Sequence, residues 1–249
     1  FVTYGYFLNF TGKHEEAVSC YDKAISIDEN NADAWSNKGT ALYHLQKFEE
    51  AVPCYDKAIS LDENHAYAWS NKGLALHRLG KHEEAVPCFD KAISLDENYV
   101  DAWHFKGLVL QRLEKHEEAV QCYNKVTSLD ENNAVAWNNK GNSLRNLQKY
   151  EEAVQCHNKS IYLDENNVAG WDGKALVLIL LREFEEAIYC FDKSISLVDN
   201  NAGTWFYKGM ALNHLLKYEE ALSCFDKAIS IDENSAVVWD FKGNTLRNL

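Results

Sequence analysis

Apolar and polar positions along this chain follow a pattern that returns every 34 residues. Within residues 32–65, apolar side chains keep the spacing of one helix face over residues 34–45 and again over residues 51–59. A polar pair at 46–47 separates the two stretches, and an Asp-Glu-Asn run at 62–64 ends the second one. The pattern predicts two helices per period, called helix A and helix B below, joined by short turns.

The period is strict along the whole chain. A tryptophan stands at the same place in each period, at Trp35, Trp69, Trp103, Trp137, Trp171, Trp205 and Trp239. The seven cysteines keep the same interval, at Cys20, Cys54, Cys88, Cys122, Cys156, Cys190 and Cys224. Such a period is typical of stacked helix–turn–helix repeats. We divide the chain into repeats at 1–31, 32–65, 66–99, 100–133, 134–167, 168–201 and 202–235, with a partial eighth at 236–249.

These positions carry a resemblance to a known family. The tetratricopeptide repeat family has W, G, Y, A, F and A where this chain has Trp35, Gly39, Leu42, Ala51, Tyr55 and Ala58. The resemblance covers the whole chain. It implies an all-α fold, a right-handed superhelical solenoid of antiparallel helix pairs, forming one continuous array over residues 1–249. In this family helix A lines a concave groove, and such grooves usually bind other proteins.

The chain departs from the family pattern in ways that predict local structure. Glutamate replaces the proline near the end of most repeats, as at Glu63, so Asp and Asn side chains must hold that turn. Lysine precedes the glycine, as at Lys38, and we expect its stem to lie on the tryptophan and its head to pair with an acid. In the sixth repeat Gly173 replaces asparagine and Ala175 replaces the glycine. We expect the least regular structure around residues 170–200.

Net charge and cysteine spacing narrow the range of partners and compartments. The 25 Lys and Arg residues against 38 Asp and Glu residues give a net charge of −13. This balance disfavours binding to nucleic-acid phosphates or to an anionic membrane surface, and no run of about 18 apolar residues predicts a transmembrane helix. Equivalent cysteines lie two helices apart, beyond the about 7 Å between Cα atoms that a disulfide tolerates. We therefore expect reduced, buried cysteines and a cytoplasmic protein.

No motif indicates catalysis or a bound cofactor. The chain lacks HxxxH, HExxH, CxxC, GxSxG, GxGxxG and a phosphate-binding loop. The Asp-Glu-Asn turns lack the alternating ligands and central glycine of a calcium loop. His14, His82 and His116 replace an aromatic residue at the start of helix B, which favours a packing role. We expect no metal, no cofactor and no enzymatic activity.

Candidate binding residues follow from the groove positions that the resemblance implies, which come one, two, five and eight to nine residues after the tryptophan. Asparagine stands at the second of them at Asn37, Asn71 and Asn139. A primary amide both donates and accepts, so a row of them suits the backbone of an extended partner. The plainer interpretation is a common polar residue on an exposed face. The other candidates in the third to fifth repeats are Arg78, His104, Phe105, Leu108, Arg112, Asn142 and Arg145.

The arginines can bind carboxylates or phosphates in a bidentate manner. The Lys, Asn and Arg order of the family's carboxylate clamp is absent. In the sixth and seventh repeats the groove positions turn apolar, at Leu176, Ile179, Leu180, Phe206, Tyr207 and Met210. A contiguous exposed apolar patch usually marks a contact surface. Packing against another turn of the superhelix, or against a segment outside this chain, is the competing interpretation.

The function that we expect is a protein–protein interaction scaffold that binds a partner peptide or segment in the groove. Two alternatives stay open: a fixed structural subunit of a larger complex that uses its convex face or ends, and the substrate-recruiting arm of a longer enzyme. Residues 239–249 nearly match residues 137–147, which a helix B follows. We therefore expect a further helix B after Leu249, and end-to-end self-association through uncapped termini.

Overall fold

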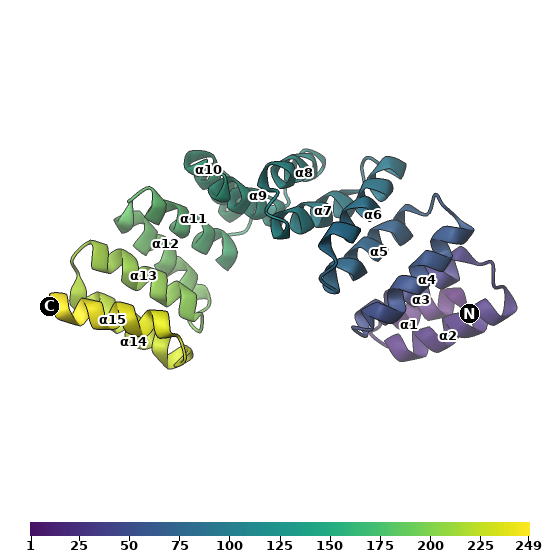
Figure 1. The fold of residues 1–249 in the computed structure, drawn as a ribbon, viewed down its shortest axis with the longest axis horizontal. Coiled ribbons are helices and arrows are strands. Elements are labelled where there is room, and N and C mark those ends of the chain that lie inside the picture. Colours follow the sequence, from purple (N-terminus) through teal and green to yellow (C-terminus); the bar gives the residue numbers. More distant parts are fainter. The chain divides into compact units, whose positions relative to one another are not determined.

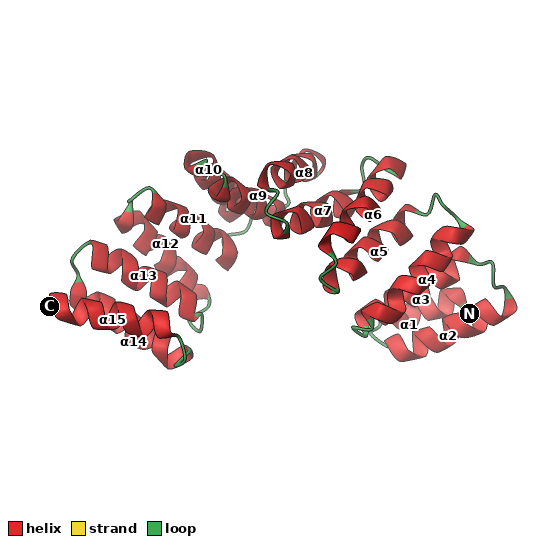
Figure 2. Ribbon diagram, in the orientation of Figure 1, coloured by secondary structure: helices red, strands yellow, loops and turns green.

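The computed structural model describes residues 1–249 and contains fifteen α-helices and no strand (Figure 2). The chain forms two compact units (Figure 1), an N-terminal unit of residues 1–130 and a C-terminal unit of residues 131–249. The N-terminal unit contains α1 (Val2–Phe10), α2 (His14–Ile27), α3 (Ala32–His44), α4 (Phe48–Leu61), α5 (Ala66–Arg78), α6 (His82–Leu95), α7 (Val100–Arg112) and α8 (His116–Leu129). The C-terminal unit contains α9 (Ala134–Asn146), α10 (Tyr150–Leu163), α11 (Val168–Leu180), α12 (Phe184–Leu197), α13 (Ala202–His214), α14 (Tyr218–Ile231) and α15 (Ala236–Asn248).

The predicted alternation of helices A and B is confirmed. Odd-numbered helices are helix A and even-numbered helices are helix B, and each A–B pair of a repeat packs together. Helix A has 13 residues and helix B has 14 in each of the second to seventh repeats. The all-α repeat fold is therefore confirmed, while the right-handed twist and the continuous array over residues 1–249 stay predictions.

A glycine in helix A lets the aromatic residue of helix B approach closely. A Cβ atom built on Gly39 would lie 2.8 Å from Cε1 of Tyr55, whose ring is almost completely buried. Ala51 and Ala58 are also buried on the same helix as that ring. The same contact recurs between Gly209 and Phe225, at 2.6 Å. The small residue is thus a steric requirement of the aromatic core in each repeat.

Side-chain hydrogen bonds hold the turn between one repeat and the next. At the end of α4, the backbone N–H of Asn64 donates to Oδ1 of Asp62 over 2.9 Å. Nε1 of Trp69 then donates to the carbonyl of Glu63 over 3.0 Å, and every repeat tryptophan makes the equivalent bond. The prediction that Asp and Asn chemistry replaces the proline is confirmed.

The sixth repeat keeps the helix lengths of the others but differs in its final turn. Val198 replaces the aspartate at the end of α12, so this turn lacks the carboxylate that accepts the Asx-type bond elsewhere. The bond from Trp205 Nε1 to the Asp199 carbonyl remains, at 2.8 Å. Helices α11 and α12 have the same lengths as their counterparts. The changed turn therefore leaves the lengths of the two helices unaltered.

A lysine links most neighbouring repeats. Nζ of Lys38 lies 2.6 Å from Oδ1 of Asp22 in the preceding helix B, and 5.6 Å from the ring centroid of Trp35. The same arrangement, predicted from the sequence, recurs at Lys72, Lys106, Lys208 and Lys242. The acids are about half exposed, so each pair contributes little to stability.

The cysteines are free thiols, and six of the seven are buried. Burial raises the pKa of Cys54 to about 11, and the same cause acts on the other five buried thiols. These thiols stay protonated at neutral pH and serve as small packing residues, as predicted. No helix has both the length and the apolar character that crossing a membrane requires. No group of three or more His, Cys, Asp or Glu side chains is placed to hold a metal ion.

Candidate functional site

The A helices line the inner side of each unit. In the N-terminal unit α1 contacts α3, α3 contacts α5 and α5 contacts α7. In the C-terminal unit α9 contacts α11, α11 contacts α13 and α13 contacts α15. The B helices make no such contacts with one another. Each unit is therefore concave on the side of its A helices, where the resemblance places the groove.

In the N-terminal unit the asparagine row has two members. Asn37 on α3 and Asn71 on α5 occupy equivalent, partly exposed positions, and Nδ2 of Asn71 donates to Oγ1 of Thr40 over 3.5 Å. On the next A helix the same position holds Phe105, whose ring lies 6.4 Å from that of Phe89. The third predicted asparagine, Asn139, is partly exposed on α9 and belongs to the other unit.

The arginines of the N-terminal unit are exposed at the ends of their helices. Nε of Arg78 donates to the hydroxyl of Tyr43 on the preceding A helix over 3.0 Å, and Arg112 is exposed at the end of α7. Leu108 is partly buried on the same helix. The ring of His104 lies edge-on to Tyr123 at 6.0 Å, and burial lowers the pKa of His104. That imidazole is packed between helices and is neutral near pH 7.

In the C-terminal unit apolar side chains reach the surface on α11 and α13. Leu180 is 51% exposed and Tyr207 is 38% exposed, while Leu176, Ile179 and Met210 are partly buried on the same two helices. Phe206 is turned toward the core, with its ring edge-on to Phe241 at 5.2 Å. The exposed part of the predicted apolar patch therefore centres on Leu180 and Tyr207.

Arg145 on α9 is a partly buried guanidinium without a carboxylate partner. No ion pair involves it, and burial lowers its pKa while Tyr207 on α13 raises it. Asn142, one turn earlier on α9, is also partly exposed. The A-helix face of this unit thus combines a cation, an amide and apolar side chains.

A buried polar contact joins the two helices of the fifth repeat, α9 and α10. His157 is completely buried, and its Nδ1 lies 3.0 Å from Oδ1 of Asn138. Burial, with a smaller contribution from Arg145, lowers the pKa of His157 to about 3. A Cβ atom on Gly173 of α11 would stand 2.4 Å from Cε1 of this imidazole. The glycine that the sequence shows in place of asparagine is therefore the neighbour that gives the histidine space.

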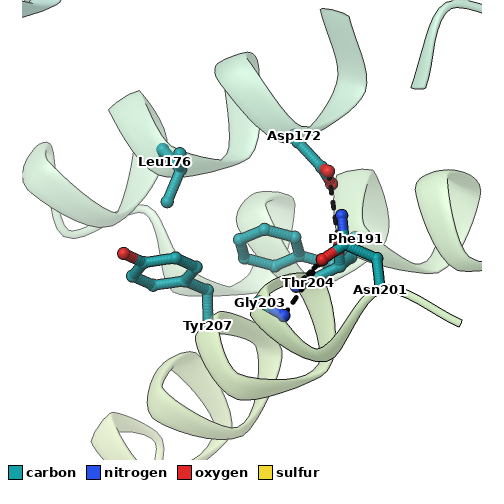
Figure 3. Close-up of a pocket in the computed structure, with 7 residues that line it drawn as sticks. All are labelled: Asp172, Leu176, Phe191, Asn201, Gly203, Thr204 and Tyr207. Atoms are coloured by element: carbon teal, nitrogen blue, oxygen red, sulfur yellow. Dashed lines mark hydrogen bonds between the residues drawn. The ribbon is translucent and has the colours of Figure 1, made fainter. Parts of the chain in front are cut away.

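A pocket of about 190 Å³ opens between α11 and α13 (Figure 3). Its lining consists of Asp172, Leu176, Phe191, Asn201, Gly203, Thr204 and Tyr207. Oδ2 of Asp172 accepts a hydrogen bond from Oγ1 of Thr204 over 3.0 Å, whereas Oδ1 is completely buried. Burial raises the pKa of Asp172, and the hydroxyls of Ser194 and Thr204 lower it in part.

The sequence prediction did not include Asp172, although a signal was present. The residue after the tryptophan is buried as Ser36, Ser70 and Asn138 in other repeats. An acid stands there at Asp172 and Asp240, and Asp240 is exposed, whereas Asp172 has polar neighbours on two further helices. Ser194 and Thr204 stand where most repeats have alanine. Polar residues at all three positions, Asp172, Ser194 and Thr204, indicate a polar cluster.

The fold defines a helical-repeat protein in which the A helices lie along one face of each unit. Sequence profiles described as tetratricopeptide repeat match residues 32–65, 66–99, 100–133, 134–167 and 202–235, and one described as TPR repeat matches residues 10–46. The matches cover most of the chain, which therefore belongs to the tetratricopeptide repeat family. No curated protein sequence matches this chain.

Solved structures share the fold at low sequence identity. A chain of the APC/C hetero-tetramer Cut9–Hcn1 matches with a TM-score of 0.76 and 17% identity over 96% of this chain and 47% of that one, so this chain spans about half its length. A tetratricopeptide repeat protein from Parabacteroides merdae matches with a TM-score of 0.71 and 19% identity over 98% and 97%. YrrB, described as a TPR protein with an unusual peptide-binding site, matches with a TM-score of 0.63 and 23% identity over 76% and 97%.

Proposed function

We propose that this chain binds an extended segment of a partner protein along the A-helix face of its C-terminal unit. Proteins of this family are generally protein-interaction scaffolds. The observation that carries the proposal is the exposure of Leu180 and Tyr207 on two A helices that contact each other. Large apolar side chains on an inner face favour a contact surface, because the hydrophobic effect favours covering them.

The polar residues of the same face complement an extended chain. Arg145 offers five donors without an acid of its own, so a carboxylate of the partner can form the bidentate pair that the chain does not supply. Asn142 can donate to a partner carbonyl and accept from its N–H. In the N-terminal unit Asn37 and Asn71 can bind a backbone in the same way. Binding would place an apolar anchor against Tyr207 and charged groups around it.

The test compares the A-helix face with a matched position on a B helix. We expect Leu180→Ala with Tyr207→Ala to remove partners that the unaltered chain retains in a pull-down, and to weaken the purified complex at least tenfold. The control is Tyr162→Ala on α10, where the side chain is 82% exposed on the opposite side of the repeat. Circular dichroism must show equal helix content. If partners still bind the Leu180 and Tyr207 double variant but no longer bind Tyr162→Ala, groove binding is contradicted.

A second candidate, a structural subunit that binds through the B-helix side, has its own supporting observation. Two apolar grooves of about 480 and 400 Å³ lie in the N-terminal unit beside Pro87 and Pro53. Leu76 lines both. Loss of partners in Pro87→Gln, which copies the residue at the equivalent position 121, would favour this candidate. End-to-end self-association and the enzyme-arm alternative stay predictions.

A further inference from the structure

Asp172 is a carboxylate that the chain desolvates without supplying a positive charge. Burial is the largest influence on its pKa, and no lysine, arginine or histidine contributes to it. Every acid paired with the repeat lysines lies on helix B and is about half exposed, whereas Asp172 lies on helix A beside the core. A desolvated carboxylate without a cation destabilises a fold, so its presence indicates a role outside folding.

The surroundings of Asp172 hold the carboxylate in place. Thr204 donates to Oδ2, and Ser194 lies close enough to lower the pKa of the acid. Four other repeats have alanine at the position of Thr204, and four have alanine at that of Ser194. The acid and its two hydroxyl neighbours therefore form one cluster built from three helices, α11, α12 and α13.

The N-terminus of α13 lies beside the carboxylate but does not neutralise it. A helix N-terminus carries about half a positive charge. Its first free amides, those of Gly203 and Thr204, already donate to Oδ1 of the N-cap residue Asn201 over 3.0 and 3.4 Å. Asp172 thus receives a hydroxyl donor and part of a helix dipole, which is less than one full cation would supply.

The pocket above the cluster accommodates one side chain. Its volume of about 190 Å³ is below the roughly 300–1,000 Å³ of pockets for drug-sized ligands. Leu176, Phe191 and Tyr207 form the apolar part of the lining, with Asp172 at one side of it (Figure 3). These walls suit a hydrocarbon stem, and the ring of Tyr207 offers a π-face to a cation.

The accessible geometry distinguishes between cationic groups. A guanidinium binds a carboxylate best through two parallel bonds, one to each oxygen. Here Oδ1 is completely buried without a hydrogen-bond partner and Oδ2 already accepts from Thr204, so a pair of parallel bonds to both oxygens is not available to a ligand. A compact ammonium needs one such contact and has no planar fork to satisfy. A free chain terminus would place its own peptide group among the apolar walls.

We propose that the pocket formed by Asp172, Leu176, Thr204 and Tyr207 binds the ammonium group of a lysine side chain of the partner segment. This inference rests on the proposed function and names one residue class that the segment must carry. The net charge of −13 attracts a basic segment at long range, and Asp172 then provides the local contact.

The test uses a small probe, so it does not depend on finding the natural partner. Nα-acetyl-lysine methylamide is titrated into the full ¹⁵N-labelled chain, and the amide signals of Gly203 and Thr204 are followed. We expect saturable shifts at both, and at least a tenfold weaker affinity in Asp172→Asn. Asp172→Ser, which copies Ser36 and Ser70, should show the same loss. The serine variant shows whether the loss comes from removing the carboxylate or from the amide that Asp172→Asn introduces.

Three related probes sharpen the outcome. The Nε-acetylated lysine probe should not bind, because its ammonium is replaced by an amide. Equal or tighter binding of Nα-acetyl-arginine methylamide, or of leucine methylamide with its free terminal amine, would overturn the lysine assignment. Absence of saturable shifts, or shifts that persist in Asp172→Asn, would overturn the site itself. The proposed function would then still be decided by the Leu180 and Tyr207 variants.

Discussion

His157 occupies the helix B position that holds tyrosine or phenylalanine in every other complete repeat. Its imidazole fills the aromatic position, contacts Asn138 and leaves Nε2 without a hydrogen-bond partner. The ring is therefore neutral in the folded state, since a charge there would be desolvated next to Arg145. A core residue that titrates makes the stability of the C-terminal unit depend on pH.

The sign of this pH dependence follows from the two pKa values. The folded pKa is about 3 and the ordinary histidine value is 6.5, so below pH 6.5 the unfolded chain binds a proton that the folded chain does not. Stability is complete above pH 6.5 and falls as the pH drops toward 3. At pH 5 the loss is about 2 kcal/mol, from 1.5 pH units at 1.36 kcal/mol each.

Urea unfolding at pH 7 and pH 5 measures this loss. The reference is Asn138→Ser with His157→Phe, which copies the pair Ser70 and Phe89 of the third repeat. We expect the double variant to lose about 2 kcal/mol less than the unaltered chain between the two pH values. Other histidines contribute equally to both proteins. Equal losses would show that His157 is not the titrating group.

Single residues also mark the limit of what could be predicted from the sequence. The glycine and alanine positions were predictable, because the family pattern assigns them to the helix contact, and the contact of Gly39 with Tyr55 confirms it. The tryptophan hydrogen bond to the turn carbonyl was not predictable, since a backbone acceptor leaves no trace in residue type. Asp172 was missed because its neighbours Ser194 and Thr204 lie 22 and 32 positions later in the chain.

At the scale of elements, the turns between repeats offer a natural comparison. Asp62 and Val198 end their helices with nearly the same backbone, at φ −141°, ψ 99° and φ −145°, ψ 108°. Only the aspartate accepts a bond from the residue two positions later. The left-handed residue between helices A and B, such as Gly80 or Gln46, is similarly set by backbone geometry and tolerates several residue types.

Val198→Asp should therefore stabilise the C-terminal unit. The new carboxylate can accept from the N–H of residue 200, as Asp164 does from Asn166 over 3.1 Å. We expect a gain of about 0.5–1.5 kcal/mol, the net value of one hydrogen bond, read from the urea midpoint. Asp164→Val in the preceding turn is the converse change and should lose a similar amount. A neutral effect of both would mean that these bonds do not stabilise the turns.

At the scale of the whole molecule, contacts run only between helices close in the sequence. Within each unit, a helix contacts its neighbours in the sequence, and an A helix also contacts the next A helix. The 34-residue period predicts this arrangement, because a single repeat cannot bury its apolar face without a neighbour. The division into an N-terminal and a C-terminal unit was not predictable, since near-identical repeats offer no change in composition at residues 130–131.

Because contacts run only between neighbouring helices, we expect a destabilising substitution to affect only its own and the adjacent repeats. Gly209→Ala would bring a Cβ atom within 2.6 Å of Phe225, whereas Gly243→Ala on α15 meets nothing within 4 Å. The first change should cost about 1–3 kcal/mol through overpacking, and the second should be neutral or slightly stabilising. Hydrogen exchange should accelerate in α13 and α14 of Gly209→Ala and stay unchanged in α3 and α4. Uniform acceleration along the chain would contradict this prediction.

Gly173 has a consequence for the order in which the repeats assemble. Every other helix A carries a side chain at this position: Thr3, Asn37, Asn71, Phe105, Asn139, Tyr207 and Phe241. Any of these would collide with His157, because even a Cβ atom would stand 2.4 Å from its ring. Most helix pairs of such a repetitive chain are nearly interchangeable, and exchanged pairings would retain the same apolar and ionic contacts. Because only α11 carries glycine here, only α11 can pack against His157 of α10 without a collision. This contact therefore distinguishes the native pairing of helices from exchanged pairings as the chain folds.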